Sequence, residues 1–340
     1  MRFDWDLVSR EFVRALRGSR SQTAFSRRLG SRTNVVYTWE AGRSFPTAHR
    51  ALRAATRAGV DVGEALTRFY RAKPPWLSGI DPVSKKGIAT LLTDLKGRTT
   101  ILDLARASSS SRFAISRWLK GEAEPRLPDF FRLIEATSLR ALDFLACFVD
   151  PAKVPSISKA WMALEAARRA AYDVPSSQAV LRCLELTDYR RLPKHRDGWI
   201  AERIGISPSE ERRCLELLAL TGQISKRLGL WAIRETRTVD TRRDATAARQ
   251  VKSWWMNVAS ERMRANAEGI FSYNVFAVSE KDLERVYDLY RSYFQQIRSL
   301  IAQSEPSERV VVANIQLFPL DGAGRSQEPA ALRRAPGGSG

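Results

Sequence analysis

The chain has 340 residues, 44% of them hydrophobic, which is enough for about two to four domains with real cores. It carries 56 Lys and Arg against 37 Asp and Glu, so a net charge of +19 favours a polyanionic partner, nucleic acid before an anionic membrane surface. No apolar run approaches the roughly 20 residues that span a bilayer, and the charged N-terminus argues against export, so we expect a cytoplasmic protein with no membrane role.

Residues 1–73 are predicted to form a five-helix domain. Within it, the segment 21–46, SQTAFSRRLGSRTNVVYTWEAGRSFP, predicts two short helices over 22–29 and 33–41. Gly30 stands where the first helix must stop sharply, a position that favours a residue tolerant of positive φ. Four apolar residues are spaced to pack between two helices that cross steeply: Phe25, Leu29, Val36 and Trp39.

The outward side of the second helix would present short polar side chains, which suit base edges in a DNA major groove. The segment resembles the lambda-repressor/Cro-like (Xre) helix-turn-helix family, with Ser26 in place of the usual Ala; the match is carried by Gln22, Phe25-Ser26, Gly30, Val36, Glu40-Ala41-Gly42 and Pro46. That family implies binding to double-stranded DNA. We expect DNA contacts, with Gln22 and Arg43 on phosphates, from Gln22, Arg32, Thr33, Asn34, Tyr37, Thr38 and Arg43. An ordinary buried helical hairpin is the alternative.

Charge is concentrated in the same region. Residues 1–73 contain 15 Lys and Arg against 6 Asp and Glu, which is nearly half of the net charge of the chain. A basic surface that only faces solvent would explain this concentration of charge. The position of the charge beside a helix-turn-helix instead favours a surface that faces DNA phosphates.

A second unit is predicted over 74–150, after a Pro-rich linker at 73–79. A helix over 85–96 precedes TTILDLARASSSSRFAISRWLKGEAEP, residues 99–125, which overlays the first motif when shifted by 79 residues. Ser109 replaces the turn glycine, and helices over 127–136 and 139–148 would complete the unit. Its outward positions are Arg112, Phe113, Ser116 and Arg117. Either this unit is a second DNA reader, or it is a diverged copy used for packing or dimerisation.

The segment 151–235 is predicted to contain helices over 157–172 and 179–186 and then a winged helix. Residues 199–207 fit a helix that ends in a turn glycine, and Ser207 and Pro208 fit the start of a helix over 208–221. Short strands over 223–227 and 230–234 would form the wing. Outward cations at Arg212, Arg213, Lys226 and Arg227 suit phosphates, whereas Glu210, Glu211 and Glu216 oppose them, so DNA contact and protein contact both stay open.

The segment 236–320 predicts a small α+β domain. A helix over 247–262 leads to an alternating, aromatic-rich strand over 270–278, a long amphipathic helix over 280–303 and a second strand over 309–320. This order predicts a β-α-β unit, and the Gly- and Pro-rich tail 321–340 is predicted to be disordered.

This C-terminal pattern resembles an uncharacterised bacterial family that pairs a helix-turn-helix region with a C-terminal domain of unknown function. The resemblance covers 85–320 and is most specific at the terminal motif NIQLFPL, residues 314–320. It implies a transcriptional regulator of unknown ligand. As that family has one N-terminal helical region, the unit at 1–73 is an addition to its pattern.

No motif for catalysis stands out. The sequence lacks a phosphate-binding glycine loop and an H-E-x-x-H zinc motif, and Cys147, Cys183 and Cys214 lack C-x-x-C spacing. His49 and His195 stand among basic residues, so we expect both to face solvent without a catalytic or metal partner. We therefore predict no enzyme activity, no metal and no cofactor.

Together these patterns predict a mainly α fold with tandem helix-turn-helix domains, a winged helix and a small C-terminal α+β domain. The leading hypothesis is a sequence-specific regulator that binds double-stranded DNA, as a homodimer, with the C-terminal domain available for dimerisation, ligand sensing or a protein partner. An antitoxin-like adaptor that binds a partner protein is the second hypothesis, and RNA binding is the third.

Overall fold

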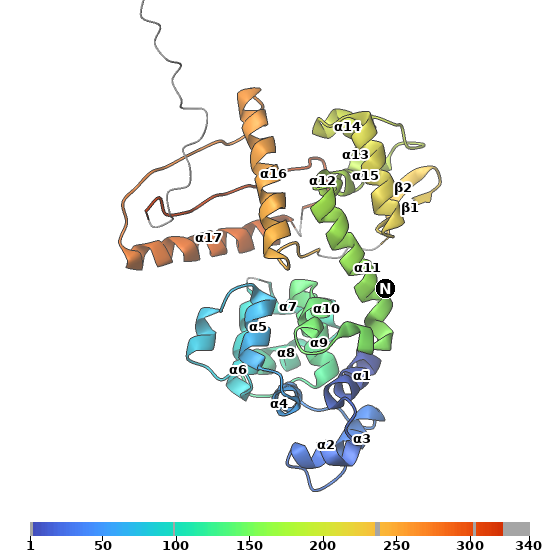
Figure 1. The fold of residues 1–340 in the computed structure, drawn as a ribbon, viewed down its shortest axis with the longest axis vertical. Coiled ribbons are helices and arrows are strands. Elements are labelled where there is room, and N and C mark those ends of the chain that lie inside the picture. Colours follow the sequence, from blue (N-terminus) through green and yellow to red (C-terminus); the bar gives the residue numbers. More distant parts are fainter. Residues whose placement is uncertain (1–2, 98, 235–238, 302–303, 322–340) are drawn as a thin grey trace, which may run out of the picture.

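The computed structural model describes residues 3–97, 99–234, 239–301 and 304–321. In this part of the chain the fold is mainly helical with one small two-stranded sheet, which confirms the mainly α fold class. Figure 1 shows helices α1 to α10 gathered in one body and α12 to β2 in another, joined by the long helix α11 (Pro155–Asp173). Two further helices, α16 and α17, lie beside the second body (Figure 1).

The first body contains the two predicted five-helix units. The first unit comprises α1 (Trp5–Arg17), α2 (Gln22–Arg28), α3 (Val35–Glu40), α4 (Ala48–Ala58) and α5 (Val62–Tyr70). After the short 3-10 turn η1 (Pro75–Ser78), the second comprises α6 (Lys85–Lys96), α7 (Ile101–Ser108), α8 (Arg112–Leu119), α9 (Leu127–Ser138) and α10 (Ala141–Ala146). The predicted limits of α6 are confirmed. The helix predicted over 139–148 starts later, because Leu139 adopts a left-handed conformation (φ +53°) that ends α9.

The two units share one apolar core. Phe12 and Phe69 of the first unit make edge-to-face contacts with Phe131 and Phe144 of the second, at ring-centroid distances of 5.4 and 5.3 Å. Phe130 packs against Phe144 in the same way at 5.6 Å, and all five rings are fully buried. Aromatic pairs of this geometry contribute about 0.5–1.5 kcal/mol each beyond their burial, so this contact fixes the two units to each other.

The second body has a separate core that includes Val180, Ile200 and Leu218. Its elements follow the 3-10 turn η2 (Pro151–Lys153) and α11, and are α12 (Ser176–Cys183), α13 (Thr187–Arg190), α14 (Trp199–Ile204), α15 (Pro208–Leu220), β1 (Ile224–Arg227) and β2 (Leu230–Ile233). The strands pair antiparallel with Lys226 opposite Trp231, so the predicted hairpin is confirmed.

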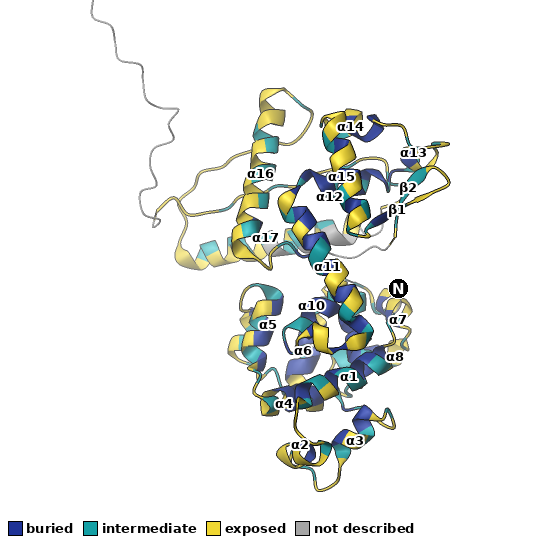
Figure 2. Cartoon of the chain, turned by 45° about the vertical axis from the view of Figure 1, so that its right-hand side comes forward, coloured by how far each residue is buried: buried dark blue, intermediate teal, exposed yellow. Residues whose placement is uncertain are grey.

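The predicted C-terminal β-α-β unit is wrong. Helices α16 (Ala245–Arg264) and α17 (Glu280–Ile301) are present, but 270–278 and 309–320 contain no strand. Alternating apolar residues give a segment the propensity for a strand, but a strand also needs a hydrogen-bonded neighbour, and neither segment pairs with another within the described residues. Most of their side chains are consequently open to solvent, with Ile270 96% and Tyr273 94% exposed. Figure 2 colours most of the chain between α16 and α17 as exposed.

Two further predictions concern the ends of the chain and the membrane. Apart from Asp321, the tail 321–340 lies outside the described residues. None of the helices described in the structure has both the length and the apolar composition needed to cross a bilayer.

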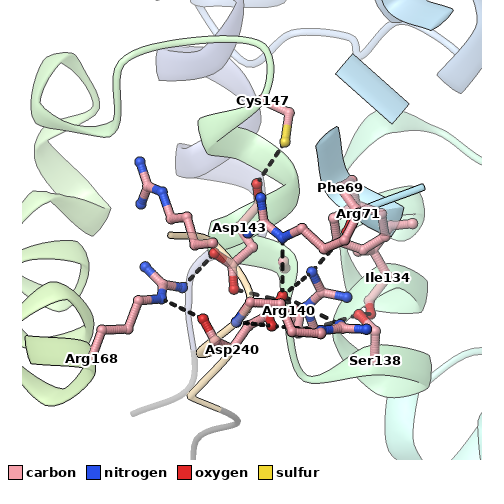
Figure 3. Close-up of polar contacts among 12 residues, drawn as sticks. Phe69, Arg71, Ile134, Ser138, Arg140, Asp143, Cys147, Arg168 and Asp240 are labelled. Atoms are coloured by element: carbon pink, nitrogen blue, oxygen red, sulfur yellow. Dashed lines mark hydrogen bonds and ion pairs between the residues drawn. The ribbon is translucent and has the colours of Figure 1, made fainter. Parts of the chain in front are cut away.

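A buried cluster of charged side chains ties the start of the C-terminal region to the first body (Figure 3). Asp240, with 3% of its side chain exposed, forms ion pairs with Arg140 at 2.5 Å, Arg242 at 2.9 Å and Arg71 at 3.4 Å. Arg168 on α11 donates from Nε to the carbonyl oxygen of Asp240 at 3.1 Å and forms an ion pair with Asp143 on α10. The cluster thus joins α10, α11 and the segment that follows residue 238.

The environment of Asp240 stabilises its charged form. Burial by itself raises the pKa of Asp240, but the hydrogen bonds of Arg242 and the charges of Arg140 and Arg242 outweigh burial, so its pKa lies well below the usual range. Asp143 differs, because burial raises its pKa despite the nearby charges of Arg168 and Arg140.

We expect Asp240→Asn to destabilise the protein at neutral pH, because buried guanidinium groups lose their carboxylate partner. A depressed folded-state pKa stabilises the fold at pH values above the unfolded pKa of about 3.9, and this contribution is lost as pH falls toward the folded pKa. The difference in unfolding free energy between wild type and variant, measured by urea titration, should therefore shrink below about pH 4.

Asp188→Asn is the matched control, because Asp188 forms an exposed pair with Arg203 that should contribute less than about 1 kcal/mol. A wild-type advantage over Asp240→Asn that stays constant down to low pH would contradict the assignment.

Candidate nucleic-acid interface

Helices α2 and α3 pack as the sequence predicts. Gly30 has φ +77° just after α2, and Ser21 and Asn34 cap the two helices through their side chains. Phe25 and Val36 are fully buried, which leaves the opposite side of α3 facing solvent.

Most of the residues expected to contact DNA lie on this exposed side. Arg32, Thr33 and Asn34 are exposed in the turn before α3. Tyr37 is 41% exposed, and the guanidinium of Arg43 lies over its ring at 5.1 Å from the centroid. The structure therefore places a polar and cationic group of side chains around the start and outer face of α3.

Asn34 has a structural task that the sequence did not reveal. Its Oδ1 accepts hydrogen bonds from the backbone N–H of Tyr37 at 3.3 Å and from the hydroxyl of Ser26 at 3.1 Å. The Ser26 hydroxyl in turn accepts from the backbone N–H of Val36 at 3.1 Å. Both acceptor sites of the Asn34 oxygen are thus used, while its Nδ2 amide makes no hydrogen bond within the described residues.

Thr38 and Gln22 are less available than predicted. The Thr38 hydroxyl donates to the carbonyl of Val35 at 2.8 Å, and the side chain is half-buried. The Gln22 amide donates to Glu40 Oε2 at 2.8 Å, so one of its two hydrogens is already engaged. A phosphate contact by Gln22 stays a prediction that rests on its second hydrogen.

Glu40 at the end of α3 holds the first unit together. Its side chain is 3% exposed and pairs with Arg17 on α1 at 2.6 Å, with Arg14 at 3.8 Å and with Gln22 on α2. Arg10 adds a bond from its Nε to the Glu40 carbonyl at 2.9 Å. One buried carboxylate therefore fixes three helices, and it was not among the predicted site residues.

The second unit repeats this geometry with different surface chemistry. Ser109, in the position of the turn glycine, has φ +55°. Arg112, Phe113 and Arg117 are exposed along α8, and Phe113 is 82% exposed, which is unusual for a large apolar side chain. Ser116 is half-buried.

The helix pair α14–α15 and the hairpin carry four exposed cations: Arg212, Arg213, Lys226 and Arg227. Of the three glutamates expected to oppose phosphates, Glu211 is buried, where its Oε2 accepts from the backbone N–H of Ala201 at 2.7 Å. Glu216 is exposed and Glu210 is half-buried, so two glutamates still border this surface.

The prediction that both histidines face solvent is wrong. His195 has 7% of its side chain exposed and lies between the Tyr189 hydroxyl at 3.2 Å and Glu211 at 3.6 Å, and burial lowers its pKa although Glu211 and Asp197 oppose this. His49 contacts Glu124 of the second unit at 2.5 Å. Glu211 is 16 residues from His195 and Glu124 is 75 residues from His49, so the sequence around each histidine did not reveal these acidic partners.

A comparison with known protein families finds a match only in the C-terminal part of the chain. Residues 158–320 match a family model described as Domain of unknown function (DUF4423). This agrees with the expected C-terminal domain of unknown function and starts at α11, later than the resemblance inferred from the sequence. Neither the curated proteins nor the solved structures contain a match to the chain.

We expect Glu40→Ala to lower the free energy of unfolding by about 3 kcal/mol, because Arg17 loses a buried ionic partner. Glu64→Ala is the matched control, since Glu64 forms only an exposed pair with Arg68 and should cost less than about 1 kcal/mol. Urea unfolding of the full chain measures both. Equal, small losses would show that the Glu40 cluster does not hold the unit together.

Proposed function

We propose that the protein is a sequence-specific, double-stranded DNA-binding transcriptional regulator. In this proposal α2 and α3 are the helix-turn-helix, and α3 enters the major groove. One observation carries it: the exposed side of α3 groups Thr33, the free amide of Asn34, and Tyr37 with Arg43, within the most basic segment of the chain.

The cap on α3 restricts what Asn34 would recognise. Because Oδ1 is engaged, the side chain can only donate from Nδ2, so it suits a base-edge acceptor such as a purine N7 or the thymine O4. Arg32 and Arg43 are free to approach phosphates, which would supply most of the affinity and make it steeply dependent on salt.

The other elements would support this task. We interpret α7–α8 as a second, diverged helix-turn-helix and α14–α15 with the hairpin as a winged helix, whose cations could hold phosphates or contact a protein. The C-terminal region would mediate homodimerisation or bind a partner.

An adaptor that binds a protein partner is the second candidate, favoured by the apolar side chains exposed over 270–320. A stoichiometric partner that co-purifies with the full chain, and is lost when Tyr273 and Phe318 are changed to Ser, would support it. A single-stranded RNA that outcompetes duplex DNA at physiological salt would instead indicate RNA binding.

We expect Asn34→Ser to relax sequence preference while leaving non-specific DNA binding nearly intact. Serine keeps an oxygen for the helix cap but removes the amide donor. Discrimination at one base pair should fall by about 5- to 150-fold, which corresponds to about 1–3 kcal/mol, in competition binding against point-mutated duplexes. If specific and non-specific affinity fall together, or neither changes, Asn34 does not recognise a base.

We expect Arg43→Ala to weaken binding about equally to every duplex, because a phosphate contact carries no sequence information. The slope of log K against log salt should fall in magnitude by about one. Arg249→Ala on α16, an exposed cation remote from α3, is the control and should leave the slope unchanged. A loss confined to one sequence would place Arg43 on a base instead.

A further inference from the structure

The two five-helix units repeat each other in backbone detail as well as in sequence. Gly18 after α1 and Gly97 after α6 are 79 residues apart and have similar unusual angles, φ +62°, ψ −136° and φ +52°, ψ −124°. Gly42 after α3 and Gly121 after α8 both have φ +74°. Equivalent positions therefore have equivalent local structure.

The contact between the units is reciprocal. Thr47 and Arg126, which are equivalent positions, face each other in an antiparallel bridge. Two hydrogen bonds of 2.9 Å complete it, from Ala48 N to the carbonyl of Pro125 and from Leu127 N to the carbonyl of Pro46. Each of these bonds becomes the other when the units are exchanged, as at the interface of a two-fold symmetric dimer.

Helix packing follows the same rule. Helix α1 of the first unit packs on α9 of the second, and α6 of the second packs on α4 of the first, which is the exchanged contact. Helices α5 and α10, the last of each unit, pack on each other, as do α4 and α9. The units are therefore related by a pseudo-two-fold axis that passes between Thr47 and Arg126.

We propose that one chain recognises two DNA half-sites, as a symmetric dimer does, with α3 on one half and α8 on the other. This rests on the proposed DNA-binding function. Glu40 at the end of α3 is seven residues from Thr47, and Leu119 at the end of α8 is seven residues from Arg126. Both helices thus end within about 25 Å of the axis, so a spacing of one DNA turn, about 34 Å, is within reach.

The two halves of the site differ in sequence, because equivalent positions carry different side chains. Thr33 corresponds to Arg112, Asn34 to Phe113, and Thr38 to Arg117. Arginine forms paired bonds with guanine O6 and N7, and phenylalanine contacts the thymine methyl group. The target is therefore an inverted pair of dissimilar half-sites, with guanine and thymine favoured in the half that α8 occupies.

Selection of bound sequences from a random duplex library by the full chain tests this. The wild type should enrich two dissimilar, inverted half-sites at a fixed spacing of about one turn. Asn34→Ser should reduce the discrimination between bases in one half-site only, by about 5- to 150-fold. The double variant Arg112→Ala with Arg117→Ala should reduce it by the same factor in the other half-site only. Inserting about half a turn between the halves should reduce affinity to that of a single half-site, and Arg249→Ala should change nothing.

The outcomes separate the two proposals. If the wild type enriches no motif, the DNA-binding function itself fails. If the wild type enriches a motif with a single half-site, DNA binding stands but the single-chain arrangement is overturned. The same conclusion follows if it enriches two identical half-sites that both respond to Asn34→Ser and do not respond to the arginine variant.

Discussion

The shared aromatic core is the constraint on which the first body depends. Phe144 of α10 contacts Phe69 of the first unit as well as Phe130 and Phe131 of its own. Because the core is common, α3 and α8 cannot change their relative position without opening it. Two separate chains that form a symmetric dimer lose translational and rotational entropy when they associate. Two units in one chain lose this entropy during folding, so it does not oppose any later binding event.

Local rules explain which helices could be predicted. The starts of α6 and α15 follow from capping residues and apolar periodicity, as at Ser207, whose hydroxyl accepts from Glu210 N. The buried partners of Asp240 could not be predicted, because Arg71, Arg140 and Arg168 come from three separate segments. In the sequence, an arginine that faces water cannot be told from one that pairs with a buried carboxylate, because the residues around both show the same apolar spacing.

Other differences between the predictions and the structure arise because one residue type or pattern can serve more than one structural purpose. Asparagine serves both at helix N-caps and at base edges, and the sequence alone predicted only the second role for Asn34. The alternating segment 270–278 has strand propensity but no edge to pair with in the described chain. The base contact of Asn34 stays a prediction, whereas the strand prediction over 270–278 was wrong.

The two units, although related, are not equally rigid around their outer helices. In the first, Arg10 and Arg14 reach the end of α3 and bond Glu40. The equivalent positions in the second are Ala89, Thr93 and Leu119, which leave a cavity of about 660 Å³ bordered by Trp76, Lys85, Lys86 and Lys120.

The end of α8 therefore lacks the ionic support that fixes α3. A buried, fully paired carboxylate specifies a single position for the helix it holds, whereas a helix end beside an open cavity loses packing contacts on that side. If the two helices bind two half-sites as proposed, α3 would present its side chains to DNA in a more fixed position than α8. The two units thus share one backbone arrangement, while their different side chains make the surroundings of α3 and α8 unequal.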